Sequence, residues 1–262
     1  MNTLKKWMLI AAMSFCASSF ANTFTADLSD LWFNESEAGW GVNVTHQREV
    51  IFLTFFIYGP TGKATWYTGQ AALSGQNSQG AATYTGTMYE FTGPYFANFF
   101  NPAAVSGRSV GTVTFTAFLD LATISYTIDG ISVTKVVTRQ TFRANDLSGQ
   151  YVGAMKQVQS GCTGQAFNGD FNNVTEFSIA HNDKSLIMTA RQPDGTVCSY
   201  DGSYTQNGRV GRAQGNYSCP GGLSGTYDIL EIESNLHGFT ARYVANNNVC
   251  SSVSGRIGAM RK

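Results

Sequence analysis

Charged side chains are scarce in this chain of 262 residues. Asp, Glu, Lys and Arg together occupy 13% of the positions, against about 25% in an average soluble domain. Acidic and basic residues balance at 17 each, so the formal net charge is 0. Nucleic acids and anionic membranes attract proteins that carry a basic excess, and we therefore expect neither as a partner.

Long apolar runs and metal-binding patterns are also missing. Beyond the N-terminal segment no apolar run reaches the length of a transmembrane helix, so we expect no membrane-spanning segment. The three histidines, His46, His181 and His237, show no HxH or HxxxH spacing, and no two cysteines form a CxxC pair. The sequence therefore predicts no metal site and no cofactor, and it offers no catalytic residue that can be assigned.

The first 21 residues have the pattern of a targeting segment. Lys5 and Lys6 precede an apolar stretch at residues 7–17, and small residues lead up to Ala21. This pattern predicts a cleavable signal peptide, cleavage after Ala21, and a periplasmic or secreted protein. Cys16 leaves a lipoprotein signal as the alternative, although the residue before it is bulky. Removal of the segment leaves a net charge of about −2.

The remaining four cysteines all lie after residue 160, and an even number in an exported chain predicts two disulfides. Cys198 and Cys219 flank a hairpin turn near Gly208. Cys162 follows the first predicted strand of the second half and Cys250 precedes the last, and these strands are neighbours in a closed antiparallel barrel. We therefore favour Cys198–Cys219 and Cys162–Cys250 over the two other pairings. Since the first half has no cysteine, we expect two domains, at residues 22–144 and 145–262.

Strand signals dominate both halves. Short β-branched and aromatic runs recur between Gly, Asn, Asp and Pro clusters, and no sustained helical period is present. Eight strands are predicted in each half: about 28–33, 39–47, 50–58, 64–73, 82–91, 110–118, 121–128 and 131–142, then 148–157, 173–181, 185–192, 197–205, 209–218, 225–233, 238–246 and 251–260. The predicted fold is all-β, with two consecutive small antiparallel up-and-down barrels of calycin-like shape.

An internal echo supports a duplicated plan. Asp27-Leu28-Ser29 in the first half resembles Asp146-Leu147-Ser148 in the second, and each triplet precedes an aromatic on the first strand. Each half also closes on a basic strand end, Arg139 in the first and Arg256 or Arg261 in the second. In barrels of the lipocalin and avidin type, an aromatic on the first strand commonly stacks under a basic residue of the last. We therefore expect cation–π pairs between Trp32 and Arg139 and between Tyr151 and Arg256.

Residues of about 28–142 also carry a motif with an LWxNxxExGWG opening. This stretch resembles a largely uncharacterised module of exported bacterial proteins, and the resemblance implies β architecture and export but no catalytic residues. It departs from the module's usual pattern at Phe33, Glu35 and Arg48. The residues that carry it include Leu31-Trp32, Asn34, Glu37, Gly39-Trp40-Gly41, Thr65-Trp66-Tyr67, Tyr84-Thr85-Gly86-Thr87, Thr92-Gly93-Pro94, Asp129-Gly130 and Arg139-Gln140.

Aromatic residues are the candidate binding residues, because flat rings at a barrel mouth can stack on sugars or cover a small apolar ligand. For Trp40 and Trp66 a packed core is the alternative interpretation. The aromatic, proline-bounded segment at residues 93–102 favours a contact surface, since loops run over the surface of proteins. The candidates are Trp40, Trp66, Tyr67, Tyr95, Phe96, Phe99 and Phe100.

The sequence thus predicts a monomeric, non-enzymatic binding protein whose target is a small apolar molecule, a glycan or an exported protein. The alternative is an envelope hydrolase or lyase with Glu37, Glu90 and Asp120 at a barrel mouth. An outer-membrane barrel is a third interpretation, which the short strands disfavour. A deep open pocket would favour the carrier and convergent carboxylates the enzyme. Filled barrels with exposed rings would favour protein–protein contact.

Overall fold

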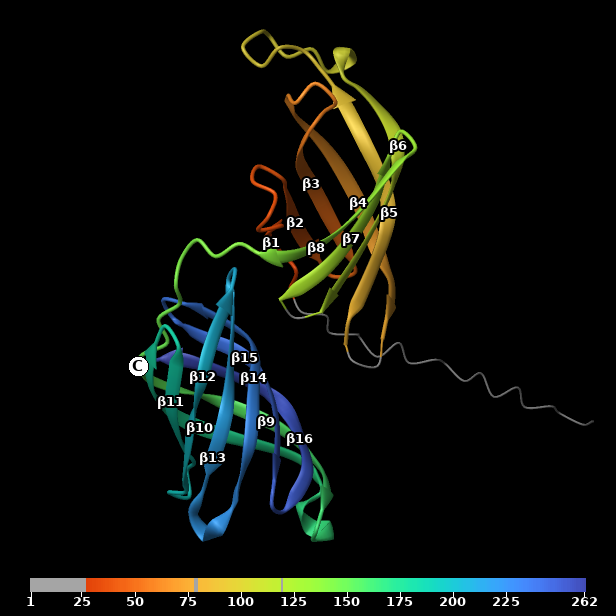
Figure 1. Ribbon diagram of the computed structural model, residues 1–262. Coiled ribbons are helices and arrows are strands. Elements are labelled where there is room, and N and C mark those ends of the chain that lie inside the picture. Colours follow the sequence, from red (N-terminus) through yellow and green to blue (C-terminus); the bar gives the residue numbers. More distant parts are fainter. Residues whose placement is uncertain (1–26, 78–79, 119) are drawn as a thin grey trace, which may run out of the picture.

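The computed structural model describes residues 27–77, 80–118 and 120–262, and the predicted signal peptide lies outside this range. The chain forms two closed antiparallel barrels of eight strands each, one after the other in the sequence (Figure 1). The predicted all-β fold of two up-and-down barrels is therefore confirmed.

The first barrel runs up and down without a crossover, and β1 pairs with β8 to close it. Each of the eight strands overlaps its predicted range, and the largest difference is in the sixth, which begins at Ser106 instead of residue 110. Their bounds, with one short 3-10 helix, are β1 Asp30–Phe33, β2 Gly41–Gln47, β3 Val50–Tyr58, β4 Ala64–Gln76, β5 Ala82–Thr92, η1 Pro102–Ala104, β6 Ser106–Phe118, β7 Leu121–Ile128 and β8 Ile131–Arg139.

The second barrel repeats this topology, with β9 paired to β16. Here β9 and β10 run several residues further than predicted and continue to pair with each other as far as Gly169 and Gln159. The bounds are β9 Gly149–Cys162, η2 Gln165–Phe167, β10 Gly169–Asn182, β11 Ser185–Arg191, β12 Val197–Asn207, β13 Val210–Ser218, η3 Pro220–Gly222, β14 Ser224–Asn235, β15 Gly238–Asn247 and β16 Cys250–Arg261. None of the short helices in the described residues has the length to span a bilayer.

Side chains fill the interior of both barrels, because alternate residues on each strand point inward. The largest fully buried side chains of the first barrel are Trp32, Phe55, Tyr84 and Phe115. The interior of the second barrel is rich in tyrosine. Burial raises the pKa of Tyr200 to about 12, which keeps this ring neutral in the core. The buried tyrosines of the second barrel are Tyr151, Tyr200, Tyr204, Tyr217, Tyr227 and Tyr243.

Two disulfides stabilise the second barrel, at the end away from the first. They join Cys162 to Cys250 and Cys198 to Cys219, the pairing that the strand order predicts. Cys162 and Cys250 are opposite each other on β9 and β16, so their bond secures the seam of the barrel. The extended end of β9 is therefore the part of the strand that reaches this bond.

A hydrogen-bonded unit closes the first barrel at the end where β1 begins. Trp32 Nε1 donates to the Leu28 carbonyl at 3.0 Å, and the Leu28 amide donates to His46 Nδ1 at 3.2 Å. The Arg139 guanidinium lies 4.6 Å from the Trp32 ring centroid and donates to the Asp27 carbonyl at 2.8 Å. The predicted Trp32–Arg139 pair is therefore present. We call this arrangement of an Asp-Leu opening, a histidine, an aromatic and a closing arginine a closure unit.

The second barrel has a closure unit with the same contacts. The Tyr151 hydroxyl donates to the Leu147 carbonyl at 2.9 Å, and the Leu147 amide donates to His181 Nδ1 at 3.3 Å. Arg261 lies 5.2 Å from the Tyr151 ring centroid and donates to the Asp146 carbonyl at 3.3 Å. The sequence echo thus marks a repeated structural device.

The predicted cation–π partner of Tyr151, Arg256, is wrong. On β16 the buried residues Ile257 and Ala259 point inward, and strict alternation places Arg261 on the same side and Arg256 on the outer side. Arg261 is also the residue opposite Tyr151 in the β9–β16 pairing. The arginine that closes the barrel is therefore the one in phase with the core.

Candidate functional site

Large rings cover part of the outer surface of the first barrel. On β3 the core residues alternate with aromatic residues that point outward, and the neighbouring strands β4 and β5 continue the row. Between 41% and 55% of each of these residues is exposed. Exposed apolar patches of this kind mark contact sites in soluble proteins. We call this surface the aromatic face; it consists of Phe52, Phe56, Tyr58, Trp66 and Phe91.

Two rings of the aromatic face lie nearly parallel. The Trp66 and Phe91 planes differ by 12°, with ring centroids 6.4 Å apart. Phe91 sits over Gly107, its neighbour on β6, where a Cβ atom would lie 2.5 Å from the ring. Gly107 therefore lets the Phe91 ring lie close against the sheet.

The connection between β5 and β6 extends the apolar surface beyond the end of the barrel. Figure 1 shows it at the end of the first barrel that faces away from the second. Phe96 is 89% exposed and Phe99 94% exposed, so these two rings have almost no cover. The segment ends in η1, which Asn101 caps by accepting a hydrogen bond from the Ala103 amide. We call residues 93–101 the aromatic loop.

Charged residues gather at the end of the first barrel that carries the aromatic loop. Arg108 on β6 pairs with Glu90 at 2.7 Å and with Asp129 at 2.6 Å. Hydrogen bonds from Arg108 hold the pKa of Asp129 below its usual value, so this carboxylate is ionised at neutral pH. Burial, together with the charges of Glu90 and Asp129, raises the pKa of Tyr67. By strand alternation Glu90 and Arg108 lie on the inner side of the sheet with Tyr67, whereas Phe91 and Gly107 lie on the outer side.

The structure separates the predicted binding residues into two groups. Trp40 belongs to the core: it is buried, and its Nε1 donates to the Tyr126 hydroxyl at 3.2 Å. Tyr67 is half-buried and points toward the barrel interior. Trp66 is exposed, so the core alternative is wrong for this residue. The other predicted residues, Tyr95, Phe96, Phe99 and Phe100, lie exposed in the aromatic loop.

The three predicted carboxylates do not converge. Glu37 pairs with Lys135 and Glu90 with Arg108, both toward the end of the first barrel that carries the aromatic loop. Asp120 lies in the β6–β7 turn at the other end, where it accepts a hydrogen bond from Asn207 at 2.5 Å. These residues therefore do not form a shared acid–base site.

One pentapeptide has the G-x-S-x-G spacing of a serine-hydrolase elbow, at residues 107–111. It lies inside β6, with Ser109 opposite Tyr89. The elbow of hydrolases is a sharp turn between a strand and a helix. The structural context therefore argues against Ser109 as a nucleophile.

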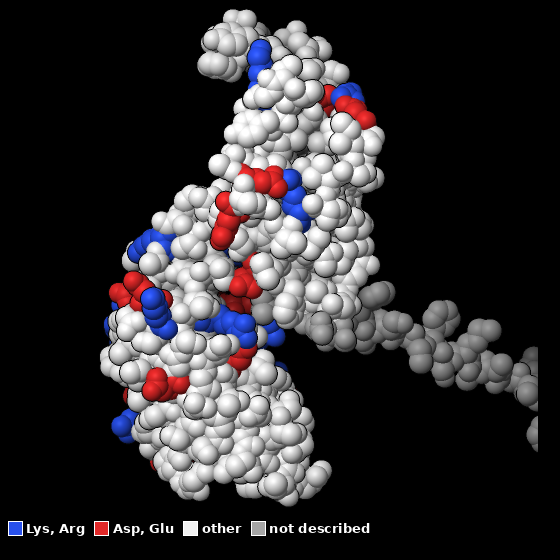
Figure 2. All heavy atoms as spheres, in the orientation of Figure 1, with Lys and Arg blue, Asp and Glu red and all other residues white. Residues whose placement is uncertain are grey.

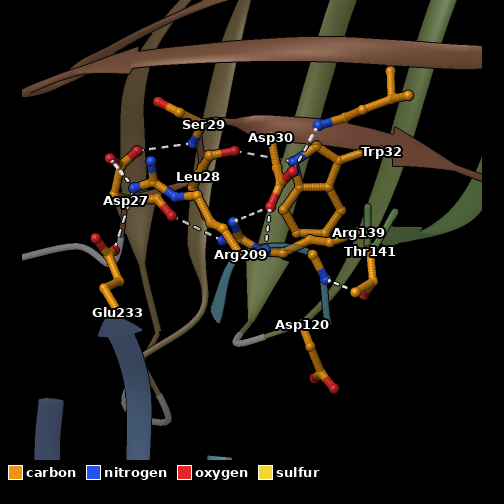
Figure 3. A network of polar contacts seen from close by, with 12 residues as sticks. Asp27, Leu28, Ser29, Asp30, Trp32, Asp120, Arg139, Thr141, Arg209 and Glu233 are labelled. Carbon is orange, nitrogen blue, oxygen red and sulfur yellow. Dashed lines mark hydrogen bonds and ion pairs between the residues drawn. The ribbon is translucent and has the colours of Figure 1, made fainter. Parts of the chain in front are cut away.

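The second barrel docks on the closure unit of the first through its β12–β13 turn (Figure 3). The Arg209 amide donates to Asp30 Oδ2 at 3.1 Å, and the Arg209 guanidinium pairs with the Asp27 carboxylate. The Gly208 amide donates to Thr141 Oγ1 at 2.8 Å. Gly208 has φ +61°, and a Cβ atom there would lie 2.2 Å from Asp30 Oδ2. Only glycine fits this contact without displacement.

Electrostatic interactions favour the docked arrangement. Burial alone would raise the pKa of Asp27, but hydrogen bonds from Ser29 and the charge of Arg209 hold it below its usual value. Burial lowers the pKa of the Arg139 guanidinium, and the Asp30 carboxylate counteracts this effect. Figure 2 shows acidic and basic side chains gathered around the junction of the barrels, while the far end of the second barrel is mostly uncharged on this face.

The junction also borders a cleft of about 1070 Å³. Its first side is the end of the first barrel, with the β2–β3 turn and Asp120. Its second side is the outer surface of β9 and of β13 to β16. Sequence reasoning missed this cleft, because no local pattern reveals that two distant surfaces face each other. The residues that line its second side include Ala154, Lys156, Arg212, Glu231, Thr240, Arg256 and Gly258.

Within the described residues, no three His, Cys, Asp or Glu side chains gather in a way that could hold a metal ion. Comparison of the chain with protein-family models, with curated proteins and with solved structures gave no match. The geometry of the exposed surfaces is therefore the basis for a functional conclusion.

Proposed function

We propose that this chain is an exported, non-enzymatic interaction protein that binds a protein partner through the aromatic face and the aromatic loop. The observation that carries this proposal is the exposure of Phe96 and Phe99, at 89% and 94%, in a loop of the cysteine-free barrel. An exposed aromatic ring lowers the solubility of a protein unless a partner covers it. Aromatic residues that become buried in a protein interface supply a large part of its binding energy.

The filled interiors of the barrels favour binding of a protein partner over transport of a small apolar molecule. Trp32, Phe55 and Phe115 occupy the centre of the first barrel, and a tyrosine cluster occupies the second. A carrier of small apolar molecules would need an open lumen in one of these places. The disulfides support export, because such bonds persist in oxidising compartments. We further propose that the first barrel belongs to the exported bacterial module that its opening motif resembles.

A photo-crosslinking residue tests the proposal. We would place benzoylphenylalanine at Phe96, and as a control at Ile187, a residue of the second barrel that is 52% exposed. Illumination of the cell that exports the protein should give a discrete protein adduct from position 96 and none from position 187. Absence of an adduct at position 96, or the same adducts from both positions, would overturn a protein contact at the aromatic loop.

A glycan is the second candidate, and the near-parallel rings of Trp66 and Phe91 favour it. Sugars stack their apolar faces on aromatic rings that are exposed in this way. Affinity electrophoresis in gels that contain soluble polysaccharides tests this alternative. Retardation that the Trp66→Ala variant abolishes, without any adduct at position 96, would replace the protein partner with a glycan.

A further inference from the structure

The cleft between the barrels has the dimensions of a small-molecule site. Its volume of about 1070 Å³ is slightly above the range that is usual for ligand pockets, which is about 300–1,000 Å³. Both barrels supply its walls, and the Arg209 contacts with Asp27 and Asp30 hold them together. A ligand in this cleft would therefore contact two separately folded units at once.

Three cations lie side by side on the second barrel, at the edge of the cleft. Lys156 on β9 is opposite Arg256 on β16, which is opposite Arg242 on β15. Like charges that are directly opposite on neighbouring strands destabilise a sheet. The Glu231 carboxylate pairs with two of them, at 3.1 Å from Arg242 and 3.7 Å from Arg256. We call Lys156, Arg256 and Arg242 the cation row.

The backbone at Glu231 is unusual. Glu231 has φ 54°, a conformation that residues other than glycine rarely adopt. It lies where the register between β14 and β15 shifts, between Leu230 and Glu233. Bulges of this kind re-aim a side chain and are common beside functional sites. Here the bulge places the Glu231 carboxylate between Arg242 and Arg256, so that it orients both guanidinium groups.

The ion pairs of Glu231 are with Arg242 and Arg256 and do not include Lys156. Throughout the described residues neither Lys156 nor Arg48, which faces the cleft from the β2–β3 turn, forms an ion pair. Two of the five acidic residues that line the cleft, Asp27 and Glu233, pair with Arg209. Cations from both barrels are therefore available to an incoming anion.

Small residues beside the cation row leave room for a ligand. Ala154 on β9 is opposite Gly258 on β16, which is opposite Thr240 on β15. Each of these residues lies two positions along its strand from a member of the cation row. A Cβ atom on Gly258 would meet nothing within 4 Å. Since side chains two residues apart lie on the same face of a strand, this open floor adjoins Arg256 directly.

We propose that the cleft binds a small polyanion, a molecule that carries at least two phosphate or carboxylate groups. Lys156 and Arg256 meet it from the second barrel and Arg48 meets it from the first. Glu231 is a positioning residue, because it orients Arg256. Guanidinium groups bind both phosphate and carboxylate with paired hydrogen bonds, which is why the two ligand chemistries share this site. This inference does not depend on the aromatic face.

Calorimetric titration of the full mature chain at low salt tests the proposal, with inorganic pyrophosphate and citrate as probes. We expect saturable binding of one molecule per chain for at least one probe, and the probe that binds identifies phosphate or carboxylate chemistry. Lys156→Gln should weaken binding by about tenfold, which is the effect of one charged contact. Arg191→Gln, which removes one exposed cation of the same barrel outside the cleft, should leave affinity unchanged.

A second pair of variants fills space instead of removing charge. Gly258→Leu should abolish binding because the new side chain occupies the floor of the cleft. Gly75→Leu is the matched control, since a Cβ atom on Gly75 also meets nothing within 4 Å and Gly75 does not line the cleft. The proposal is overturned if neither probe binds saturably. It is equally overturned if Arg191→Gln weakens binding as much as Lys156→Gln, or Gly75→Leu as much as Gly258→Leu.

Discussion

In the first barrel the closing arginine, Arg139, is completely buried and faces Asp30, whereas Arg261 occupies the same place in the second barrel and is exposed. The closure units are otherwise built from the same contacts. Conversely, within the described residues both disulfides lie in the second barrel, and the large set of exposed aromatic rings lies on the outer strands and the longest loop of the first.

This contrast shows that barrels with the same closure unit can be stabilised in two different ways. The first barrel relies on a buried cation and on docking by its neighbour, and the second on covalent bonds at its far end. Because the first barrel needs no crosslinks, its outer surface and loop are free for contacts. Among the described residues the tryptophans are Trp32, Trp40 and Trp66, which all lie in the first barrel, so their fluorescence reports on that barrel.

Removal of both disulfides should have the largest effect on this comparison. Replacement of the four cysteines by alanine should lower the unfolding free energy of the second barrel by about 2–4 kcal/mol per bond. Urea unfolding followed by far-UV circular dichroism should show an earlier transition, while the midpoint by tryptophan fluorescence should stay constant. A fluorescence midpoint that falls in step with the dichroism would show that the barrels are not stabilised independently.

Substitution of the closing arginines should have the opposite pattern, with a larger loss of unfolding free energy in the first barrel than in the second. Arg139→Ala leaves the Asp30 carboxylate, whose side chain is 10% exposed, without its buried partner. Loss of one member of a buried ion pair costs about 3–5 kcal/mol. The matched Arg261→Ala variant should cost about 1 kcal/mol, because an exposed cation–π contact is weak. Equal costs in urea unfolding would mean that burial of Arg139 is not what distinguishes the barrels.

The sequence was sufficient for the fold because its signals are local. Turn residues such as Asp129-Gly130 separate the strands, and cysteine positions relative to the strands indicated both disulfides. The closing residue of the second barrel, Arg261, was mistaken for Arg256 although its phase with Ile257 and Ala259 identifies it. Alternation along the strand from Ile257 and Ala259 leads to Arg261 and not to Arg256.

The sites were harder to predict because they depend on distant surfaces. The exposure of the aromatic loop was predicted from its composition, but the orientation of Trp66 was not, since a tryptophan in a strand suits either face. The docking of Arg209 on Asp27 and the cleft beside it require the relative placement of the barrels, and no pattern within either barrel encodes that placement. The bulge at Glu231 likewise follows from a register that only the folded sheet shows.

The junction should be sensitive to the glycine of the β12–β13 turn. Gly208→Val forces both a disfavoured backbone and a clash with Asp30, a cost of about 1–3 kcal/mol, and should separate the barrels while each stays folded. Small-angle X-ray scattering should then show a larger maximum dimension. Gly195→Val is the control, because Gly195 has φ +88° but a Cβ atom there meets nothing within 4 Å. Identical scattering from Gly208→Val and the wild type would contradict docking through this turn.

The smallest expected effect is a pH dependence of the second barrel. Burial lowers the pKa of His181 below its usual value, so the unfolded chain binds a proton more readily than the folded one. Stability from this residue is therefore complete above about pH 6.5 and is lost as the pH falls through the folded pKa. His181→Gln, which keeps an acceptor for the Leu147 amide, should flatten this part of the urea-midpoint profile. An unchanged profile would assign the dependence to other groups.

Hydrogen exchange measured by mass spectrometry, with and without the partner recovered by crosslinking at position 96, tests the functional contrast between the barrels most directly. The aromatic loop, residues 93–101, has few backbone hydrogen bonds of its own, and its amides should exchange slowly only when the partner is bound. Residues 163–168, which connect β9 and β10 in the second barrel, serve as the internal reference. Slower exchange in residues 93–101 alone is the predicted result. Slower exchange confined to residues 163–168, or in neither segment, would contradict the assignment of the contact surface to the first barrel.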